Sequence, residues 1–122
     1  MNATKILVFQ EYQGLNLLIE NILREDGYEH IYTISDPESV VAAYNDLKPD
    51  VFLCEIELHH QFENFIDLIL STERTALMSK LICIISKNNQ LMKVSTERLG
   101  VKRYLEKPFF IEEVKIMVDD CL

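Results

Sequence analysis

The stretch Pro49-Asp50-Val51-Phe52-Leu53-Cys54-Glu55 decides the fold of this 122-residue chain. An apolar run follows a proline and an aspartate and ends in a carboxylate, and the residues after Glu55 are polar and irregular. Such a run is typical of a strand that is buried on both faces of a sheet. Because ligands bind beyond the carboxyl ends of the strands in an open parallel sheet, Glu55 is a candidate site residue.

Further apolar runs on both sides of this stretch predict four more strands, at residues 6–9, 31–34, 81–85 and 101–105. The run at 31–34 is more polar than the others, which is typical of an edge strand. The run at 81–85 is the most hydrophobic one in the chain, so we expect it to be a central strand.

Between these runs, apolar residues recur at the spacing of an amphipathic helix, which predicts helices over about 15–23, 37–47, 62–69, 90–99 and 111–122. The first apolar stripe consists of Leu15, Leu18, Ile19, Ile22 and Leu23, and the thin fourth stripe of Leu91, Ser95 and Leu99. Gly27 is a suitable cap for the end of the first helix. Ser35 or Asp36, followed by Pro37, is a strong start for the second.

The resulting order, βαβαβαβαβα, predicts an α/β fold in which helices cover both faces of a parallel sheet. Residues 1–122 are enough for one domain and not for two. No stretch is apolar enough to span a membrane, and the N-terminus lacks the layout of a signal peptide, so we expect a cytoplasmic protein.

The composition excludes several classes of protein. A formal net charge of −8 argues against direct binding to nucleic acid, which requires clustered basic residues. The three cysteines, Cys54, Cys83 and Cys121, have no zinc-type spacing, and we expect buried, reduced thiols. The adjacent pair His59-His60 is expected to be solvated, so no metal site is predicted.

Polar side chains stand at the carboxyl ends of four predicted strands. Gln10 and Glu11 follow the first strand, Glu55 ends the third, Ser86 follows the fourth, and Lys107 follows the fifth. Because the carboxyl ends of parallel strands meet at one edge of the sheet, these groups are expected to converge. They form either a functional site or a set of polar residues that merely end their strands.

Four stretches of the chain, at residues 5–11, 48–55, 84–86 and 100–109, resemble the receiver domain of bacterial response regulators, the CheY-like family. The most specific of them is Lys107-Pro108-Phe109 after a short strand, with an aromatic residue, Tyr104, three positions before the lysine. The resemblance covers essentially the whole chain. It implies a flavodoxin-like (βα)5 fold of three layers, with strand order 2-1-3-4-5.

The resemblance also implies roles for the residues at the strand ends. A typical receiver has an aspartate where Glu55 stands, and this aspartate accepts a phosphoryl group from a histidine kinase. An acidic pair, which binds Mg²⁺ together with the acceptor, takes the positions of Gln10 and Glu11. Glu57 takes the position of a residue that approaches the same metal ion.

Three further positions match the residues that respond to phosphorylation in the family. Ser86 stands where a Thr or Ser hydroxyl follows the phosphoryl oxygens, and Lys107 stands where a lysine pairs with the acceptor. Tyr104 takes the place of the aromatic residue whose rotamer reports the state of the site.

The departures from the family pattern concern the chemistry itself. Glu55 is one methylene longer than aspartate, so its carboxylate meets an incoming phosphoryl group in the wrong place. Gln10 offers a neutral amide where the family has a carboxylate. We therefore expect weak Mg²⁺ binding or none, no other cofactor, and a degenerate phosphoacceptor site at Glu55.

These features favour an atypical receiver that works without phosphorylation in a two-component-type pathway, as a protein-interaction module and not as an enzyme. Partners, or a second copy in a homodimer, would bind the fourth helix, fifth strand and fifth helix, with no direct contact to nucleic acid or membrane. The charged residues expected there are Lys93, Glu97, Arg98, Lys102, Arg103, Glu106, Glu112 and Lys115.

Alternative interpretations remain open at the level of sequence. The chain is a working phosphoacceptor with a non-standard site, or the N-terminal receiver of a longer regulator with an output domain. A flavin- or nucleotide-binding protein on the same fold is disfavoured, because no glycine-rich phosphate loop is present. Within the atypical receiver, Glu55 either imitates a phosphorylated aspartate or forms a simple ion pair with Lys107.

Overall fold

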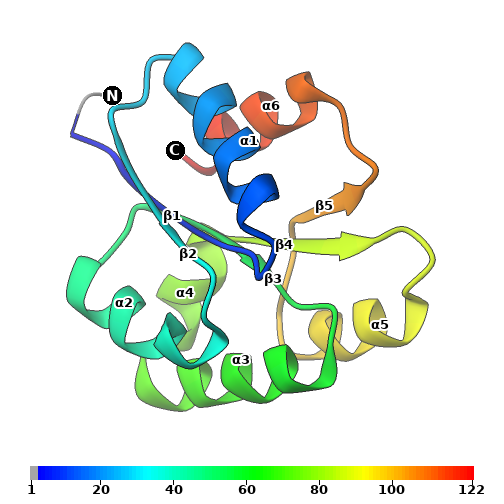
Figure 1. Cartoon of the computed structure of the whole chain (residues 1–122). Helices are drawn as coiled ribbons and strands as arrows, with labels where there is room; N and C mark the ends of the chain where they lie inside the picture. Colours follow the sequence, from blue (N-terminus) through cyan, green and yellow to red (C-terminus); the bar gives the residue numbers. More distant parts are fainter. Residues whose placement is uncertain (1–2) are drawn as a thin grey trace.

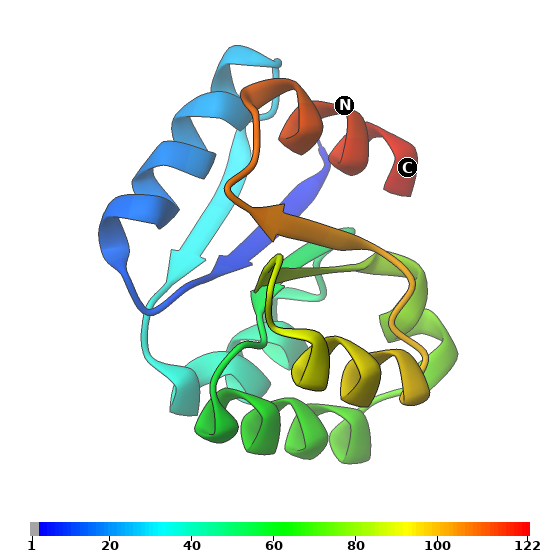
Figure 2. The same ribbon diagram turned by 90° about the vertical axis from the view of Figure 1, so that its right-hand side faces the viewer.

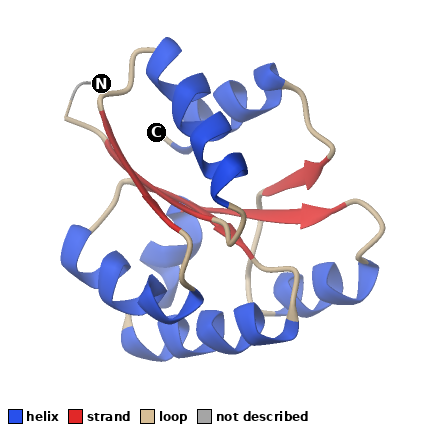
Figure 3. Cartoon of the chain, in the orientation of Figure 1, coloured by secondary structure: helices blue, strands red, loops and turns tan. Residues whose placement is uncertain are grey.

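Five parallel strands form a single sheet in the computed structural model, which describes residues 3–122 (Figures 1 and 3). They are β1 (Lys5–Phe9), β2 (His30–Ile34), β3 (Val51–Glu55), β4 (Leu81–Ser86) and β5 (Tyr104–Lys107). Their order is β2-β1-β3-β4-β5, and every neighbouring pair is parallel. The structure thus confirms the predicted fold class and strand order, with β2 at an edge.

Helices cover both faces of the sheet. The long elements are α1 (Gln13–Glu25), α2 (Val40–Leu47), α3 (His59–Ser71), α5 (Gln90–Arg98) and α6 (Ile111–Cys121), with a short helix α4 (Arg74–Lys80) and a 3₁₀ turn, η1 (Pro37–Ser39). Helices α1 and α6 lie on one face and α2 to α5 on the other (Figures 1 and 2). The sheet is therefore the middle of three layers.

The side-chain alternation of the strands divides the core in two. In β1, Ile6 and Val8 pack with the cluster under α1 and α6, whereas Leu7 and Phe9 pack with the cluster under the other helices. Neighbouring strands repeat this division. Because both faces are covered, each central strand is apolar at nearly every position, which explains the continuous apolar runs of the sequence.

The predicted helix boundaries are confirmed where the backbone requires a particular residue. Gly27 has a φ of 97° and follows Asp26, the C-cap residue of α1; glycine adopts this conformation without steric cost. The side chain of Asp36 accepts a hydrogen bond from the N–H of Glu38, and Pro37 takes the first position of η1.

Two elements differ from the prediction. Helix α4 was not predicted, because only Leu77 and Met78 of its seven residues are buried and the apolar period is too short to recognise. Strand β5 begins at Tyr104 and ends at Lys107, whereas the prediction placed it at residues 101–105. The reason is the register, because the paired residues run from Cys83 with Tyr104 to Ser86 with Lys107.

Two predicted apolar stripes were wrong in detail. Leu18 in α1 is 44% exposed, and Asn16 is buried in its place. Leu91 in α5 is 81% exposed, and the buried residue of that helix is Thr96. In both cases a polar side chain is buried because it forms hydrogen bonds there, which periodicity of apolar residues does not reveal.

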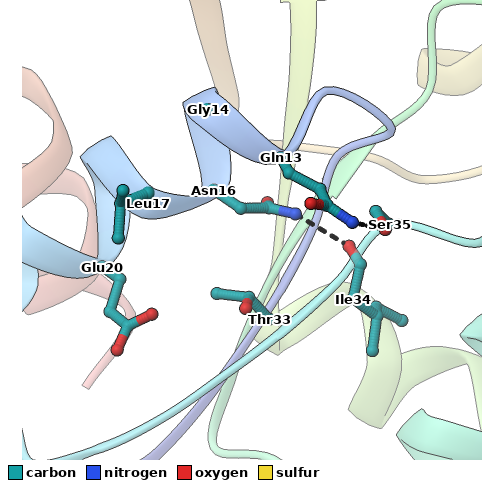
Figure 4. Close-up of a pocket in the computed structure, with 8 residues that line it drawn as sticks. All are labelled: Gln13, Gly14, Asn16, Leu17, Glu20, Thr33, Ile34 and Ser35. Atoms are coloured by element: carbon teal, nitrogen blue, oxygen red, sulfur yellow. Dashed lines mark hydrogen bonds between the residues drawn. The ribbon is translucent and has the colours of Figure 1, made fainter.

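Asn16 ties α1 to the carboxyl ends of two strands. Its side-chain NH₂ group donates to the carbonyl of Gln10 at 2.9 Å and to that of Ile34 at 3.0 Å, the latter shown in Figure 4. Asn16 also lines a cleft of about 390 Å³ between α1 and the end of β2 (Figure 4). The amide thereby fixes the loop that carries the β1 end of the candidate site.

Replacement of Asn16 by alanine is expected to lower the free energy of unfolding by about 1–3 kcal/mol, because a buried strand-end carbonyl loses its donor. Urea unfolding measures this loss. Leu17→Ala on the exposed side of the same helix is the control, with an expected change within about 0.5 kcal/mol. Equal stabilities of the two variants would contradict the proposed role of Asn16.

Candidate functional site

The carboxyl edge of the sheet brings together the polar strand ends predicted from sequence. Phe9 of β1 is the register partner of Cys54 in β3, so Gln10 and Glu11 emerge beside Glu55. Ser86 of β4 is the partner of Lys107 in β5. From β1, the next strand β2 lies on one side, and all later strands lie on the other. This edge therefore includes the point between β1 and β3 where the strand order reverses, which is the usual place for a site in such folds.

Lys107 bridges two glutamates at the centre of this site. Its Nζ atom lies 3.0 Å from Oε2 of Glu55 and 2.9 Å from Oε2 of Glu57. Burial alone would lower the pKa of Lys107, but the hydrogen bonds and charges of Glu57 and Glu55 outweigh burial and raise it. The ammonium is therefore held in its charged form and joins the end of β5 to the end of β3.

Glu57 is directed toward β4 and β5. Its Oε1 atom accepts a hydrogen bond from the backbone N–H of Ser86 at 2.8 Å, and its backbone carbonyl accepts one from Asn89 at 3.1 Å. Burial would raise the pKa of Glu57, but the hydrogen bonds from Ser86 and Lys107 outweigh it and lower that pKa. Ser86 therefore engages Glu57 through its backbone N–H, and its side chain also contributes to the lowered pKa.

Glu55 is 8% exposed, and donors of this chain face both of its carboxylate oxygens. Oε2 accepts from Lys107, while Oε1 accepts from Nε2 of Gln61 at 2.8 Å and from the backbone N–H of Glu11 at 3.3 Å. The Gln61 nitrogen also donates to Oε1 of Glu11 at 3.1 Å, and the ring of His60 contacts the same oxygen. Four structural elements thus converge on two carboxylates.

Gln10 lies behind this network. Its side chain is 0% exposed, and neither its amide oxygen nor its amide nitrogen has a hydrogen-bond partner among residues 3–122. The amide is therefore buried without protein partners, an arrangement that costs stability. The network therefore does not engage the Gln10 side chain.

Tyr104 points under α5. Its hydroxyl lies 2.7 Å from Oγ1 of Thr96 and donates to the carbonyl of Lys93 at 3.3 Å, while the Lys93 ammonium lies 5.3 Å from the ring centroid. Burial is the main reason that the pKa of Tyr104 is raised to about 12. The ring is thus fixed between β5 and α5.

Sequence reasoning missed three residues of the site: Gln61, His60 and Asn89. His59 and His60 are exposed, as predicted, but they lie in the first turn of α3 and not in a loop. A glutamine three residues after a helix N-cap is a known capping signal, but the N-cap residue here is Leu58, which hides the usual pattern. Asn89 caps α5 by accepting from the N–H of Met92.

The residues at this edge do not fit the Mg²⁺ ion that the fold suggests. Mg²⁺ requires oxygen ligands in near-octahedral geometry. Here the oxygens of Glu55 face N–H donors, and the Gln61 nitrogen lies where Glu11 and Glu55 approach each other. The amide oxygen of Gln10 is free of such donors, but a single buried, neutral oxygen does not make a site for this ion.

The remainder of the described chain shows no second chemical centre of this kind. Within residues 3–122, no cluster of His, Cys, Asp or Glu is arranged to hold a metal ion, and no helix is long and apolar enough to cross a membrane. Cys54, Cys83 and Cys121 are free, and burial raises the pKa of each thiol. A raised pKa disfavours the reactive thiolate.

No family model matches the chain, but two curated proteins are similar to it. It is 24% identical over 105 residues to the chemotaxis protein CheY of Thermotoga maritima, which covers 86% of each chain. It is 27% identical over 118 residues to the alkaline phosphatase synthesis transcriptional regulatory protein PhoP of Bacillus subtilis, covering 97% of this chain. The match spans only 48% of PhoP, about half of that relative.

Solved receiver structures superpose closely on the chain. The receiver domain of NtrX from Brucella abortus matches with a TM-score of 0.75 and 23% identity, covering 97% of this chain and 98% of that one. CheY4 of Vibrio cholerae matches with a TM-score of 0.79 and 16% identity over 98% of each chain. The chain has a receiver-type fold. Relatives and structural neighbours together support a CheY-like response-regulator receiver domain.

The lowered pKa of Glu57 predicts a defined pH dependence of stability. The folded protein binds fewer protons than the unfolded chain below the ordinary value of 4.5, so the contribution of Glu57 is present above pH 4.5 and lost as the pH falls through the folded-state pKa. Glu57→Gln is expected to cost about 1–3 kcal/mol near neutral pH. The difference from wild type should shrink below pH 4.5.

Urea unfolding from neutral to acidic pH measures this effect. Asp67→Asn, on the exposed side of α3, removes a charge of the same sign away from the site and is the control. A difference between wild type and Glu57→Gln that does not change with pH would contradict the ionic role of Glu57.

Proposed function

We propose that the chain is a signalling domain of the receiver type that binds protein partners and works without phosphorylation of Glu55. The observation that supports this proposal most strongly is that donors of the protein face both oxygens of the Glu55 carboxylate. Lys107 faces one oxygen, and Gln61 with the Glu11 N–H faces the other, so a phosphoryl group would have to compete with donors of the protein at either oxygen. The poor fit to Mg²⁺ removes the electrostatic help that phosphoryl transfer requires.

The proposed partner surface is formed by α5, β5 and α6, which correspond to the fourth helix, fifth strand and fifth helix of the sequence prediction. Lys93 pairs with Glu106 at 3.2 Å, and Lys115 lies 3.8 Å from Glu112, so part of the charge expected there is paired within the domain. The exposed apolar side chains on its two helices include Leu91, Val94 and Ile116. Apolar contact supported by mixed charges suits a protein partner or a second copy.

Within this function, we propose that Glu55 holds the site in one state. Glu55, Lys107 and Glu57 connect β3 to β5, and Tyr104 on β5 is fixed under α5 by its hydroxyl. The site and the proposed surface are therefore joined by one short strand. This connection gives the Glu55–Lys107 pair a route to the partner surface that does not need phosphate.

A position at the N-terminus of a longer regulator is compatible with the same function. PhoP is about twice as long as the segment that the chain matches. A longer NtrX structure from Brucella abortus also matches the whole chain, and the match covers 27% of that NtrX chain. In such an arrangement the α5–β5–α6 surface would contact an output domain of the same protein.

The first test is phosphorylation by a small acyl-phosphate donor with Mg²⁺, followed by mass spectrometry of the intact protein. Wild type is expected to gain no phosphoryl group. The variant that combines Gln10→Asp, Glu55→Asp and Gln61→Ala shortens the acceptor, restores a carboxylate and removes the amide that faces the acids, so it is expected to incorporate one. A phosphoryl group on Glu55 of the wild type would support the alternative, a working phosphoacceptor with a glutamate.

The second test is Glu55→Gln, which keeps the shape of the side chain and removes its charge. We expect the ring resonances of Tyr104 to move in the NMR spectrum, because Lys107 loses one of its two charged partners. Asp67→Asn is again the matched control. Unchanged Tyr104 resonances would mean that Glu55 only pins two loops together and carries no information to the surface.

A further inference from the structure

We infer that the side-chain amide of Gln61 is a built-in substitute for a bound cation, which keeps the carboxylates of Glu11 and Glu55 together. This inference goes beyond the proposed function, because it proposes that one residue, Gln61, prevents cations from binding between Glu11 and Glu55. It does not depend on which partner the domain binds. The residue was not among the predicted site residues.

The orientation of the Gln61 amide follows from its surroundings. Gln61 is the third residue of α3 and is only 2% exposed. Its Oε1 atom accepts hydrogen bonds from the backbone N–H groups of Glu57 and Leu58, both at 2.9 Å. Because an amide flip would place an NH₂ group against two N–H donors, the nitrogen has to face the carboxylates.

The amide nitrogen meets two acids, one at the end of β3 and one in the loop after β1. Nε2 of Gln61 lies 2.8 Å from Oε1 of Glu55 and 3.1 Å from Oε1 of Glu11. Two carboxylates that converge on one point repel each other unless a donor or a cation stands between them. An NH₂ group offers one N–H bond to each oxygen, so Gln61 performs this task without carrying a charge.

The charges around Gln61 explain why this position is sensitive. Glu55 and Glu57 share the ammonium of Lys107, whereas Glu11 is contacted by Gln61 and the ring of His60. Glu11 therefore relies on neutral or conditionally charged donors. An additional negative charge at position 61 would therefore lie beside Glu11, the acid of the site that Lys107 does not contact.

A cation cannot bind between Glu11 and Glu55 while Gln61 stays in place. A divalent ion requires oxygen ligands, and Gln61 presents N–H groups to that point while its own oxygen serves two backbone donors. Moving Gln61 away would leave the partly buried N–H groups of Glu57 and Leu58 without their acceptor, which is unfavourable. The wild-type site is therefore closed to cations by its own structure.

The test is Gln61→Glu, which is nearly isosteric and replaces the NH₂ group by an oxygen. One oxygen of the introduced carboxylate can still accept from the two backbone N–H groups, and the other adds a third acid between Glu11 and Glu55. Without divalent ions, we expect the Tm at neutral pH to fall by about 5 °C or more. Millimolar Mg²⁺ or Ca²⁺ is expected to reverse a large part of this loss, because the ion binds only the folded state.

Two further variants complete the experiment. Asn64→Asp adds the same charge one turn later on α3 and is expected to show no cation-dependent Tm. Gln61→Ala removes the amide without adding a charge, and its titration with Mg²⁺ by calorimetry is expected to show binding that wild type lacks. This variant also decides the question if Gln61→Glu does not fold.

Two results would overturn the inference. One is saturable stabilisation of the wild-type protein by Mg²⁺ or Ca²⁺, which would show that Gln61 does not close the site. The other is the absence of any cation effect in both Gln61 variants. Failure of the proposed function would appear separately, as a phosphoryl group on Glu55 in the mass spectrum.

Discussion

The hydrogen-bonded clamp on the Glu55 carboxylate is the interaction on which the rest of the site depends. Lys107 from β5 holds one oxygen, and Gln61 from α3 with the Glu11 N–H at the end of β1 holds the other. The clamp therefore joins the end of β3 to β5, to α3 and to the loop after β1. A buried carboxylate is tolerated at this place only because each of its oxygens has a donor.

The clamp is also the reason why we propose that the site keeps the architecture of the fold without its usual chemistry. A receiver-type fold places acids, a hydroxyl and a lysine at one edge of a parallel sheet, and the chain retains this arrangement. The donors that face the acids are N–H groups of the protein itself, and Ser86 contacts Glu57 through its backbone. The result is a site whose charges are balanced internally, with Tyr104 on β5 leading from it toward the proposed partner surface.

The sequence was sufficient for the fold because the strands are continuous apolar runs and most helices keep an apolar period of 3.6 residues. The strand ends were also predictable, since parallel strands necessarily bring Glu55, Ser86 and Lys107 to one edge. Asn16 and Gln61 were not predictable from apolar periodicity, because each is buried through hydrogen bonds to segments distant in sequence. Helix α4 was missed for the different reason that two buried residues do not define a period.

The most direct test of this account is a crystal structure of the wild-type protein grown with Mg²⁺ and a phosphoryl analogue. The account predicts that the Gln61 nitrogen still lies between Glu11 and Glu55, that Lys107 still bridges Glu55 and Glu57, and that neither additive occupies the site. A metal ion coordinated by Glu11 and Glu55, or the phosphoryl analogue bound to the Glu55 carboxylate, would contradict it.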